Sequence, residues 1–137
     1  MKLLFVVYRD LKSGVGITKK INAQCRAFIE NNCTTDLHYY KQLPNGHLAS
    51  YINKGIYKDY GKGIVARLRT LINRTNLVQY VVENNISLVY IRYEFFADFS
   101  FLHLLSKLKE QNVTVIMEIP TYPYDNEIKR RSLLSFI

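Results

Sequence analysis

The sequence predicts an α/β domain in which a parallel β-sheet is flanked by helices. Two patterns in the chain carry this prediction. Short, uninterrupted apolar runs are typical of strands buried on both faces. Between them lie longer segments whose apolar residues recur with the period of an amphipathic helix. Strands that alternate with helices are joined by crossover connections, and such connections link parallel strands.

The expected elements follow from these runs in order. The strands are expected at residues 3–8, 36–40, 47–51, 88–92 and 113–117. The helices are expected at residues 17–31, 61–84 and 98–110, with Asp98 as an N-cap. At least four strands should be parallel, and those at 88–92 and 113–117 should pair in parallel because a helix connects them.

Length and charge limit the possible classes of protein. A chain of 137 residues is expected to form one domain, and its ordinary share of apolar and charged residues fits a soluble globular protein. The net charge of +8 favours anionic partners, such as phosphorylated small molecules, nucleic acid or an acidic membrane surface. Charge alone does not choose between these partners.

The N-terminus and the cysteines indicate a cytoplasmic protein. The apolar run after Met1 is too short for a signal peptide and is followed by Arg9 and Asp10. No stretch approaches the roughly 20 apolar residues that span a bilayer. Cys25 and Cys33 lie eight residues apart, outside any metal-ligand spacing, and are interpreted as reduced thiols.

Ligands of parallel α/β sheets bind beyond the carboxyl ends of the strands. This rule selects residues 8–17, 92–96 and 118–125. In the first segment, Gly14 and Gly16 precede a helix whose N-terminus favours a phosphate. A dinucleotide fingerprint is excluded, because Lys19 stands where a third glycine is required, and no P-loop sequence is present. The alternative is a plain turn from strand to helix.

The last two segments carry a resemblance to a known family. The pairing of Val89-Tyr-Ile-Arg-Tyr93 with Val115-Ile-Met-Glu-Ile-Pro-Thr-Tyr-Pro-Tyr124 resembles the N-terminal domain of family 4 glycosyltransferases, which have the GT-B fold. The first segment is similar as well, with an apolar strand, the loop Ser13-Gly14-Val15-Gly16 and a helix. The resemblance covers nearly the whole chain.

The resemblance implies a two-domain enzyme that transfers a sugar from a nucleotide-sugar donor to a glycan or lipid-linked acceptor, as in cell-envelope polysaccharide biosynthesis. Residues 1–137 would be the Rossmann-like, three-layer domain on the acceptor side. The C-terminal donor-binding domain would lie outside this chain, which alone is expected to be inactive. No metal or other cofactor is implied. A lipid-linked acceptor would place the enzyme at the inner face of the plasma membrane.

The resemblance also implies site residues. Residues expected to bind substrate are Gly14, Val15, Gly16, Arg92, Tyr93, Thr121 and Tyr122. The glycine loop would lie near the donor diphosphate. Glu118 stands nearest to the position where many members carry a histidine, and it is the candidate catalytic residue, as a base or as a group that orients the acceptor hydroxyl. The alternative is a structural ion pair between Arg92 and Glu118.

A basic segment at residues 54–74 is a second functional signal. It contains six cationic residues and one carboxylate, Asp59, interleaved with apolar residues. Such a segment can lie on an anionic membrane. The other interpretation is that the apolar arc packs on the sheet while the charges form a solvated face. Both interpretations remain open.

Other classes fit less well. A receiver-type signalling domain requires paired acids after the first strand, where only Asp10 is present. A nucleic-acid-binding module lacks a recognition motif, so no nucleic-acid partner is expected. A non-catalytic interaction domain derived from a transferase is the remaining alternative. The surface left by a missing partner domain would also permit a homodimer.

Overall fold

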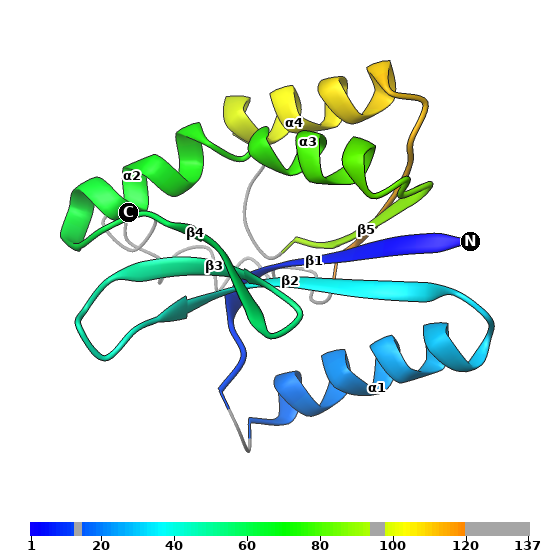
Figure 1. The fold of residues 1–137 in the computed structure, drawn as a ribbon, viewed down its shortest axis with the longest axis horizontal. Helices are drawn as coiled ribbons and strands as arrows, with labels where there is room; N and C mark the ends of the chain where they lie inside the picture. The colour runs from blue at the N-terminus through cyan, green and yellow to red at the C-terminus, as the bar shows by residue number, and fades with distance from the viewer. Residues whose placement is uncertain (13–14, 94–97, 120–137) are drawn as a thin grey trace, which may run out of the picture.

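The computed structural model describes residues 1–12, 15–93 and 98–119, which form one six-stranded sheet and four helices (Figure 1). The strands are β1 (Lys2–Asp10), β2 (Thr34–Gln42), β3 (Leu48–Ile52), β4 (Gly55–Asp59), β5 (Leu88–Arg92) and β6 (Thr114–Glu118). The helices are α1 (Gly16–Glu30), α2 (Gly63–Ile72), α3 (Asn76–Glu83) and α4 (Phe99–Glu110). The α/β class predicted from the sequence is confirmed, and the arrangement is compatible with a Rossmann-like fold.

The parallel part of the sheet contains four strands. The strand order is β4-β3-β2-β1-β5-β6, and β1 pairs in parallel with both β2 and β5. β5 and β6 also pair in parallel, with Leu88 opposite Thr114 and Arg92 opposite Glu118. The predicted parallel pairing of the strands at 88–92 and 113–117 is therefore confirmed.

The sheet as a whole is mixed, so the prediction of a purely parallel sheet is wrong at one edge. β2 pairs antiparallel with β3, and β3 pairs antiparallel with β4. The reason is the length of the connection, because only Asn53 and Lys54 separate β3 from β4. Asn53 has a φ of 57°, a left-handed conformation that asparagine tolerates in tight turns. So short a link permits a hairpin but no crossover.

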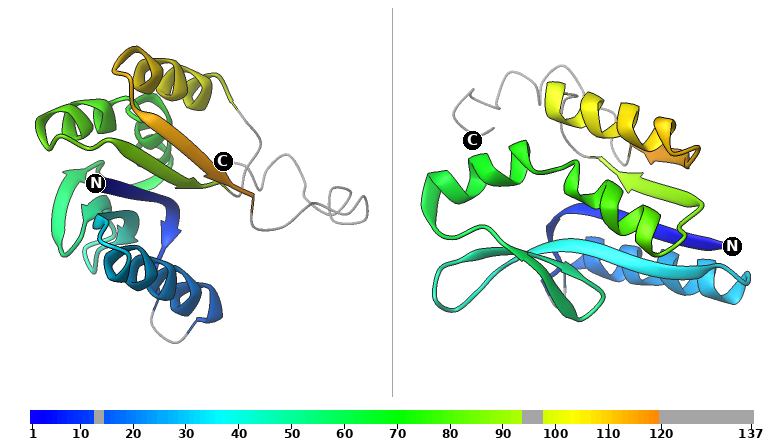
Figure 2. Two further views of the ribbon diagram at one scale, coloured as in Figure 1. Left: turned by 90° about the vertical axis from the view of Figure 1, so that its right-hand side faces the viewer. Right: turned by 45° about the horizontal axis from the view of Figure 1, so that its top comes forward.

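Helices cover both faces of the sheet (Figures 1 and 2). α1 lies on one side, whereas α2, α3 and α4 lie on the other. β1 supplies both cores, because its side chains alternate between the faces. Leu3, Phe5 and Val7 pack towards α1, and Leu4 and Val6 pack towards α3 and α4. All five side chains are at most 2% exposed, and each contributes roughly 1.5–3 kcal/mol by burial.

The helix expected at 61–84 is two helices, and the prediction of one long helix is wrong. α2 ends at Ile72 and α3 begins at Asn76. Asn73 ends α2, because both its backbone N–H and its side-chain amide donate to the carbonyl oxygen of Arg69. A side chain that competes in this way for backbone partners is a helix terminator. Arg74 then turns into the core.

The break changes which apolar residues are buried. The buried positions in α2 and α3 are Ala66, Leu77 and Val81. Four apolar residues of α2 that were expected to pack on the sheet are exposed instead, namely Ile64 (67%), Val65 (56%), Leu68 (47%) and Ile72 (74%), and Val82 of α3 is 50% exposed. For α2, the interpretation that its apolar arc packs on the sheet is therefore wrong. Within the described ranges, no helix combines the length and the apolar character needed to cross a bilayer.

Candidate functional site

The carboxyl ends of the parallel strands form one edge of the sheet. β1 lies between β2 and β5, and the helices that follow β1 and β5 cover opposite faces. The chain therefore reverses its winding direction at β1. In open α/β sheets, ligands bind in the crevice outside the carboxyl ends of the strands at such a point.

The start of α1 lies beside this edge. Val15 is the N-cap residue, has extended backbone geometry and carries no side-chain acceptor for the first backbone N–H groups of the helix. A Cβ built on Gly16 would meet no atom within 4 Å. This helix start is therefore uncrowded, which suits either a bound phosphate or a plain turn. Gly14 lies outside the described residues.

Arg92 and Glu118 form the ion pair that the sequence left as an alternative. They are register partners on neighbouring parallel strands. Arg92 Nη1 donates to Glu118 Oε1 at 2.8 Å, and the two side chains are 3% and 16% exposed. Oε2 accepts hydrogen bonds from Gln24 Nε2 at 3.0 Å and from the Tyr90 hydroxyl at 3.1 Å. Lys20 Nζ of α1 lies 3.5 Å from Oε1.

These contacts fix the charge state of Glu118. Burial alone raises the pKa of its carboxyl, but the hydrogen bonds from Gln24 and Tyr90 and the positive charges of Arg92 and Lys20 outweigh burial, so the pKa lies below its usual value. Both carboxylate oxygens are already bound to donors. This environment favours a group that holds α1 and β5 in position over one that takes up a proton.

Of the other residues expected to bind substrate, Tyr93 has its side chain on a different face of the sheet from Glu118. Tyr93 belongs to the core formed with α3 and α4, on the face of the sheet opposite to Glu118. Its ring stacks on Phe101 at 3.9 Å, and its hydroxyl accepts from Arg74 at 3.4 Å. The structure thus brings the side chains of Arg92 and Glu118 together and places the side chain of Tyr93 on the other face, although the backbone N–H of Tyr93 donates to the carbonyl oxygen of Glu118. Thr121 and Tyr122 lie outside the described residues.

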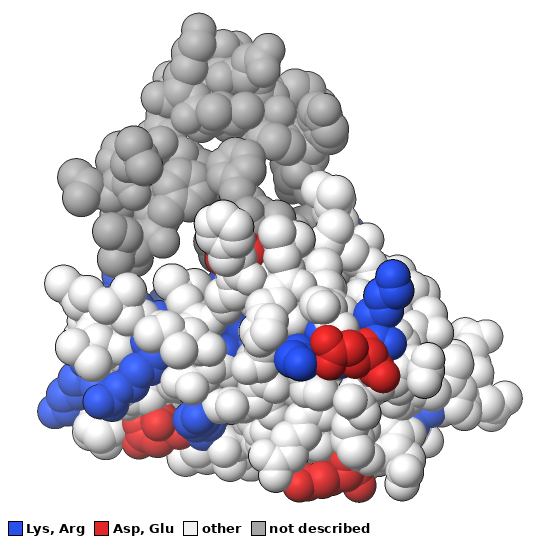
Figure 3. Space-filling model, turned by 90° about the horizontal axis from the view of Figure 1, so that it is seen from above, with Lys and Arg blue, Asp and Glu red and all other residues white. Residues whose placement is uncertain are grey.

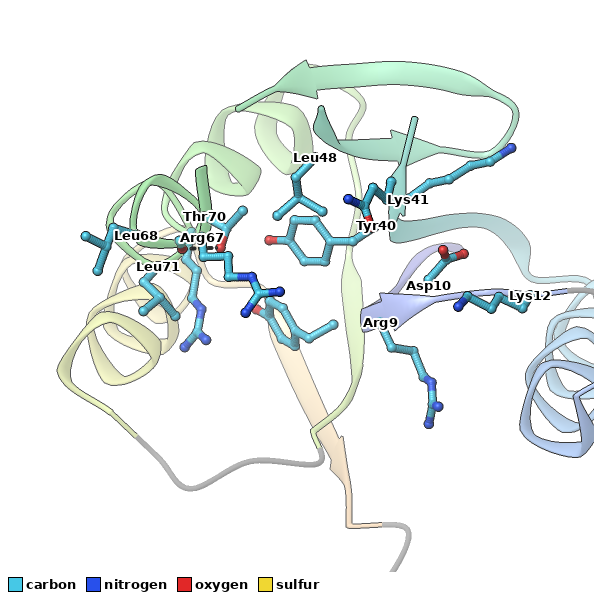
Figure 4. Close-up of a pocket in the computed structure, with 13 residues that line it drawn as sticks. Arg9, Asp10, Lys12, Tyr40, Lys41, Leu48, Arg67, Leu68, Thr70 and Leu71 are labelled. Carbon is cyan, nitrogen blue, oxygen red and sulfur yellow. Dashed lines mark hydrogen bonds between the residues drawn. The ribbon is translucent and has the colours of Figure 1, made fainter. Parts of the chain in front are cut away.

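The structure also contains a cavity of about 440 Å³ between the ends of β1 and β2 and helix α2 (Figure 4). Cationic side chains outnumber carboxylates in its lining, and Asp10 carries the one carboxylate among the lining residues. The lining residues are Tyr8, Arg9, Asp10, Lys12, Tyr40, Lys41, Gln42, Leu48, Arg67, Leu68, Thr70, Leu71 and Arg74. In Figure 4, Tyr40 extends from β2 towards Thr70 of α2, and Arg9 and Lys12 lie at the β1 side.

Two tyrosines form the aromatic part of the cavity lining. The rings of Tyr8 and Tyr40 stack at 6.2 Å. Burial raises the pKa of both hydroxyls, so they remain protonated hydrogen-bond donors at neutral pH. The Tyr8 hydroxyl is buried and has no hydrogen-bond partner among the described residues. The guanidinium of Arg74 lies 5.0 Å from the centroid of the Tyr8 ring, a cation–π contact.

The sequence predicted only the β1 side of this cavity. Residues 8–17 were selected because they follow the first strand, and this segment contains Tyr8, Arg9 and Lys12. The contribution of α2 was missed, because its apolar residues were expected to be buried. The sequence does hold a signal for the end of α2, because the side chain of Asn73 donates to the carbonyl oxygen of Arg69.

The basic segment surrounds an apolar surface. We define the α2–α4 apolar surface as the exposed residues Ile64, Val65, Leu68, Ile72, Phe99 and Leu102. Cationic side chains flank α2 at Lys62, Arg67 and Arg69, and Lys58 lies on β4. Figure 3, which views this side of the molecule, shows Lys and Arg side chains near its left margin with uncharged side chains between them. Arg74 is the exception in the segment, because it is buried.

Neither a metal site nor a known relative assigns a function to this chain. The residues that the structure describes contain no group of three His, Cys, Asp or Glu side chains able to hold a metal ion. Cys25 and Cys33 are free thiols. No protein-family model, curated protein or solved structure matches this chain.

Proposed function

We propose that this chain is the acceptor-side, N-terminal domain of a GT-B glycosyltransferase of family 4, which transfers a sugar from a nucleotide-sugar donor to a glycan or lipid-linked acceptor. The observation that carries the proposal is the edge of the parallel core. There, Arg92 and Glu118 lie at the ends of two neighbouring strands, and Glu118 contacts α1, whose first backbone N–H groups receive no side-chain cap from Val15. The donor-binding half of the site would come from a second domain.

In this proposal the residues have separate roles. The backbone N–H groups that begin at Gly16 stabilise the negative charge of the donor diphosphate, which grows as the sugar leaves. Glu118 holds α1 against the sheet through Gln24 and Lys20, and so sets the position of that helix start. Its four donors and lowered pKa support this positioning role over the catalytic role expected from the family.

We further propose that the domain docks on the anionic inner face of the plasma membrane. The α2–α4 apolar surface would enter the interfacial region of the bilayer, and the flanking cations would attract acidic headgroups. Such docking would bring the cavity beside α2 close to a lipid-linked acceptor. A soluble glycan acceptor would have no need of it.

The test uses the parent protein, in which a donor-binding domain accompanies this chain. Release of nucleoside diphosphate from a panel of nucleotide sugars is measured with membrane extracts as acceptor. We expect Glu118→Gln to lower turnover by a large factor per folded molecule, and Glu110→Gln, on the surface of α4, to leave it unchanged. Absence of transfer from every donor would contradict the enzyme assignment.

The result also separates the roles of Glu118. A positioning role predicts that Glu118→Gln weakens donor binding, raising KM along with the loss of turnover, because the start of α1 shifts. A base role predicts that donor binding is kept while turnover falls. A salt-dependent mobility shift of the chain on nucleic acid, without transfer, would favour the alternative of a non-catalytic binding domain.

A further inference from the structure

The cavity between β1, β2 and α2 has a cationic lining that the edge at Glu118 does not use. Arg9 and Lys12 lie at its β1 side, and Arg67 and Arg74 come from the helical side. The ammonium group of Lys41 lies over the Tyr51 ring, 5.8 Å from its centroid. Arg74 Nη1 lies 2.9 Å from Asp98 Oδ2, and Asp10 is the one carboxylate that lines the cavity beside Arg9, Lys12 and Arg67. The lining is therefore suited to an anion that carries more than one negative charge.

The hydroxyl of Tyr8 supplies an independent indication of a ligand. It is buried in the cavity lining and has no partner among the described residues. A buried O–H without an acceptor destabilises the folded state by roughly 1–3 kcal/mol. Because burial keeps this hydroxyl protonated, it can donate to an anionic oxygen that enters the cavity. The site thus combines guanidinium charge with a directed donor.

The rim of the cavity towards α2 is apolar. Leu48, Leu68 and Leu71 line the cavity together with the cations. Leu68 is also 47% exposed and belongs to the α2–α4 apolar surface. An anionic group in the cavity would therefore lie next to an exposed apolar stripe on the same helix. This juxtaposition matches an amphiphile with an anionic head and an apolar chain.

We propose that this cavity binds the phosphate or diphosphate group of a lipid-linked molecule whose apolar chain leaves over Leu68 along α2. The cavity volume of about 440 Å³ is within the usual range for small-molecule sites and is large enough for a diphosphate and an attached sugar. The inference deepens the proposed function, on which it rests for the identification of this molecule as the acceptor.

The test measures binding to the 137-residue chain by titration at low salt. Inorganic pyrophosphate, geranyl diphosphate and geraniol are the three probes, which separate a free phosphate compound from a phosphorylated lipid. We expect geranyl diphosphate to bind more tightly than pyrophosphate, and geraniol not to bind. Shifts of backbone amide NMR signals should centre on residues 8–12 and 67–71.

Two variants and a control locate the site. Arg67 is exposed on α2, so Arg67→Gln should fold normally and weaken geranyl diphosphate binding by about tenfold or more, the value of a charged hydrogen bond. Tyr8→Phe should weaken it by about threefold to tenfold, as expected for a neutral donor. Arg26→Gln removes the same charge from the exposed side of α1 and should have no effect.

Three results would overturn the proposal. These are the absence of diphosphate binding, an equal loss in the Arg26→Gln control, and equal affinity for pyrophosphate and geranyl diphosphate. The last result would assign the cavity to soluble phosphate compounds. Sugar transfer by the parent protein is assayed separately. Transfer without diphosphate binding would reject the cavity alone, and diphosphate binding without transfer would reject the enzyme alone.

Discussion

Asp98 has two structural roles that substitution can separate. Its carboxylate caps α4, because Oδ1 accepts a hydrogen bond from the backbone N–H of Phe101 at 2.8 Å. The same carboxylate accepts from Arg74 Nη1 at 2.9 and 3.0 Å. Asp98→Asn keeps an oxygen that can cap the helix but removes the charge. Asp98→Ala removes both.

The expected magnitudes follow from burial. The side chain of Arg74 is 6% exposed, so loss of its carboxylate partner leaves a nearly buried cation. Breaking a fully buried pair costs about 3–5 kcal/mol. Because Asp98 is 44% exposed, water replaces part of the interaction, and we expect about 2 kcal/mol for Asp98→Asn. Loss of the N-cap adds about 1 kcal/mol, which gives about 3 kcal/mol for Asp98→Ala.

The assay is urea unfolding of the 137-residue chain at pH 7, followed by circular dichroism. Glu110→Gln is the matched control, because Glu110 pairs with Lys107 on the exposed side of the same helix and should change the free energy of unfolding by less than about 0.5 kcal/mol. Melting temperatures should fall by roughly 4 °C for each kcal/mol in a domain of this size. An Asp98→Asn variant as stable as the control would refute the argument.

Three further predictions concern pH and the membrane. Burial lowers the pKa of His38 from 6.5 to about 4. The free energy of unfolding should therefore fall by up to about 3 kcal/mol as the pH drops through that interval. In urea titrations, His38→Phe should remove this dependence on pH. Because the pKa of the Glu118 carboxyl is lowered in the folded state, its contribution to stability is complete above the ordinary pKa of a carboxyl and is lost as the pH falls through the lower folded value. Glu118→Gln should therefore reduce the loss of stability at acid pH. An unchanged loss would contradict the ion pair with Arg92. The 137-residue chain should bind phosphatidylglycerol vesicles in sedimentation assays, less at high salt and less after Ile64→Ser with Ile72→Ser. Equal binding to phosphatidylcholine vesicles would reject docking by charge.

The fold was predictable wherever burial left a clear pattern. The apolar runs at 3–8, 88–92 and 113–117 correspond to β1, β5 and β6. Helices cover β1 and β5 on both faces, whereas β6 is an edge strand on which Ile116 and Met117 are exposed. The β3–β4 hairpin was not predicted as such. It lies at the sheet edge, where β4 is largely exposed and carries no continuous apolar run.

The candidate site was predictable in part for a related reason. Arg92 and Glu118 each end an apolar strand, so parallel pairing alone makes them neighbours. Strand alternation sends Tyr93 to the other face, and the sequence-based rule of shared strand ends did not take this into account. The cavity was not predictable, because its lining combines the ends of β1 and β2 with α2, and the sequence pattern does not place α2 relative to these strands.

The central position of β1 also determines the order in which the chain can fold. β1 is made first, but its second neighbour, β5, begins at Leu88. Until α3, β5 and α4 are complete, Leu4 and Val6 have no helix to cover them. Pairing β5 with β1 closes the long segment of chain between them, which is entropically unfavourable and slow. A nascent chain should therefore expose one apolar face of its first strand to chaperones until about residue 110 has left the ribosome.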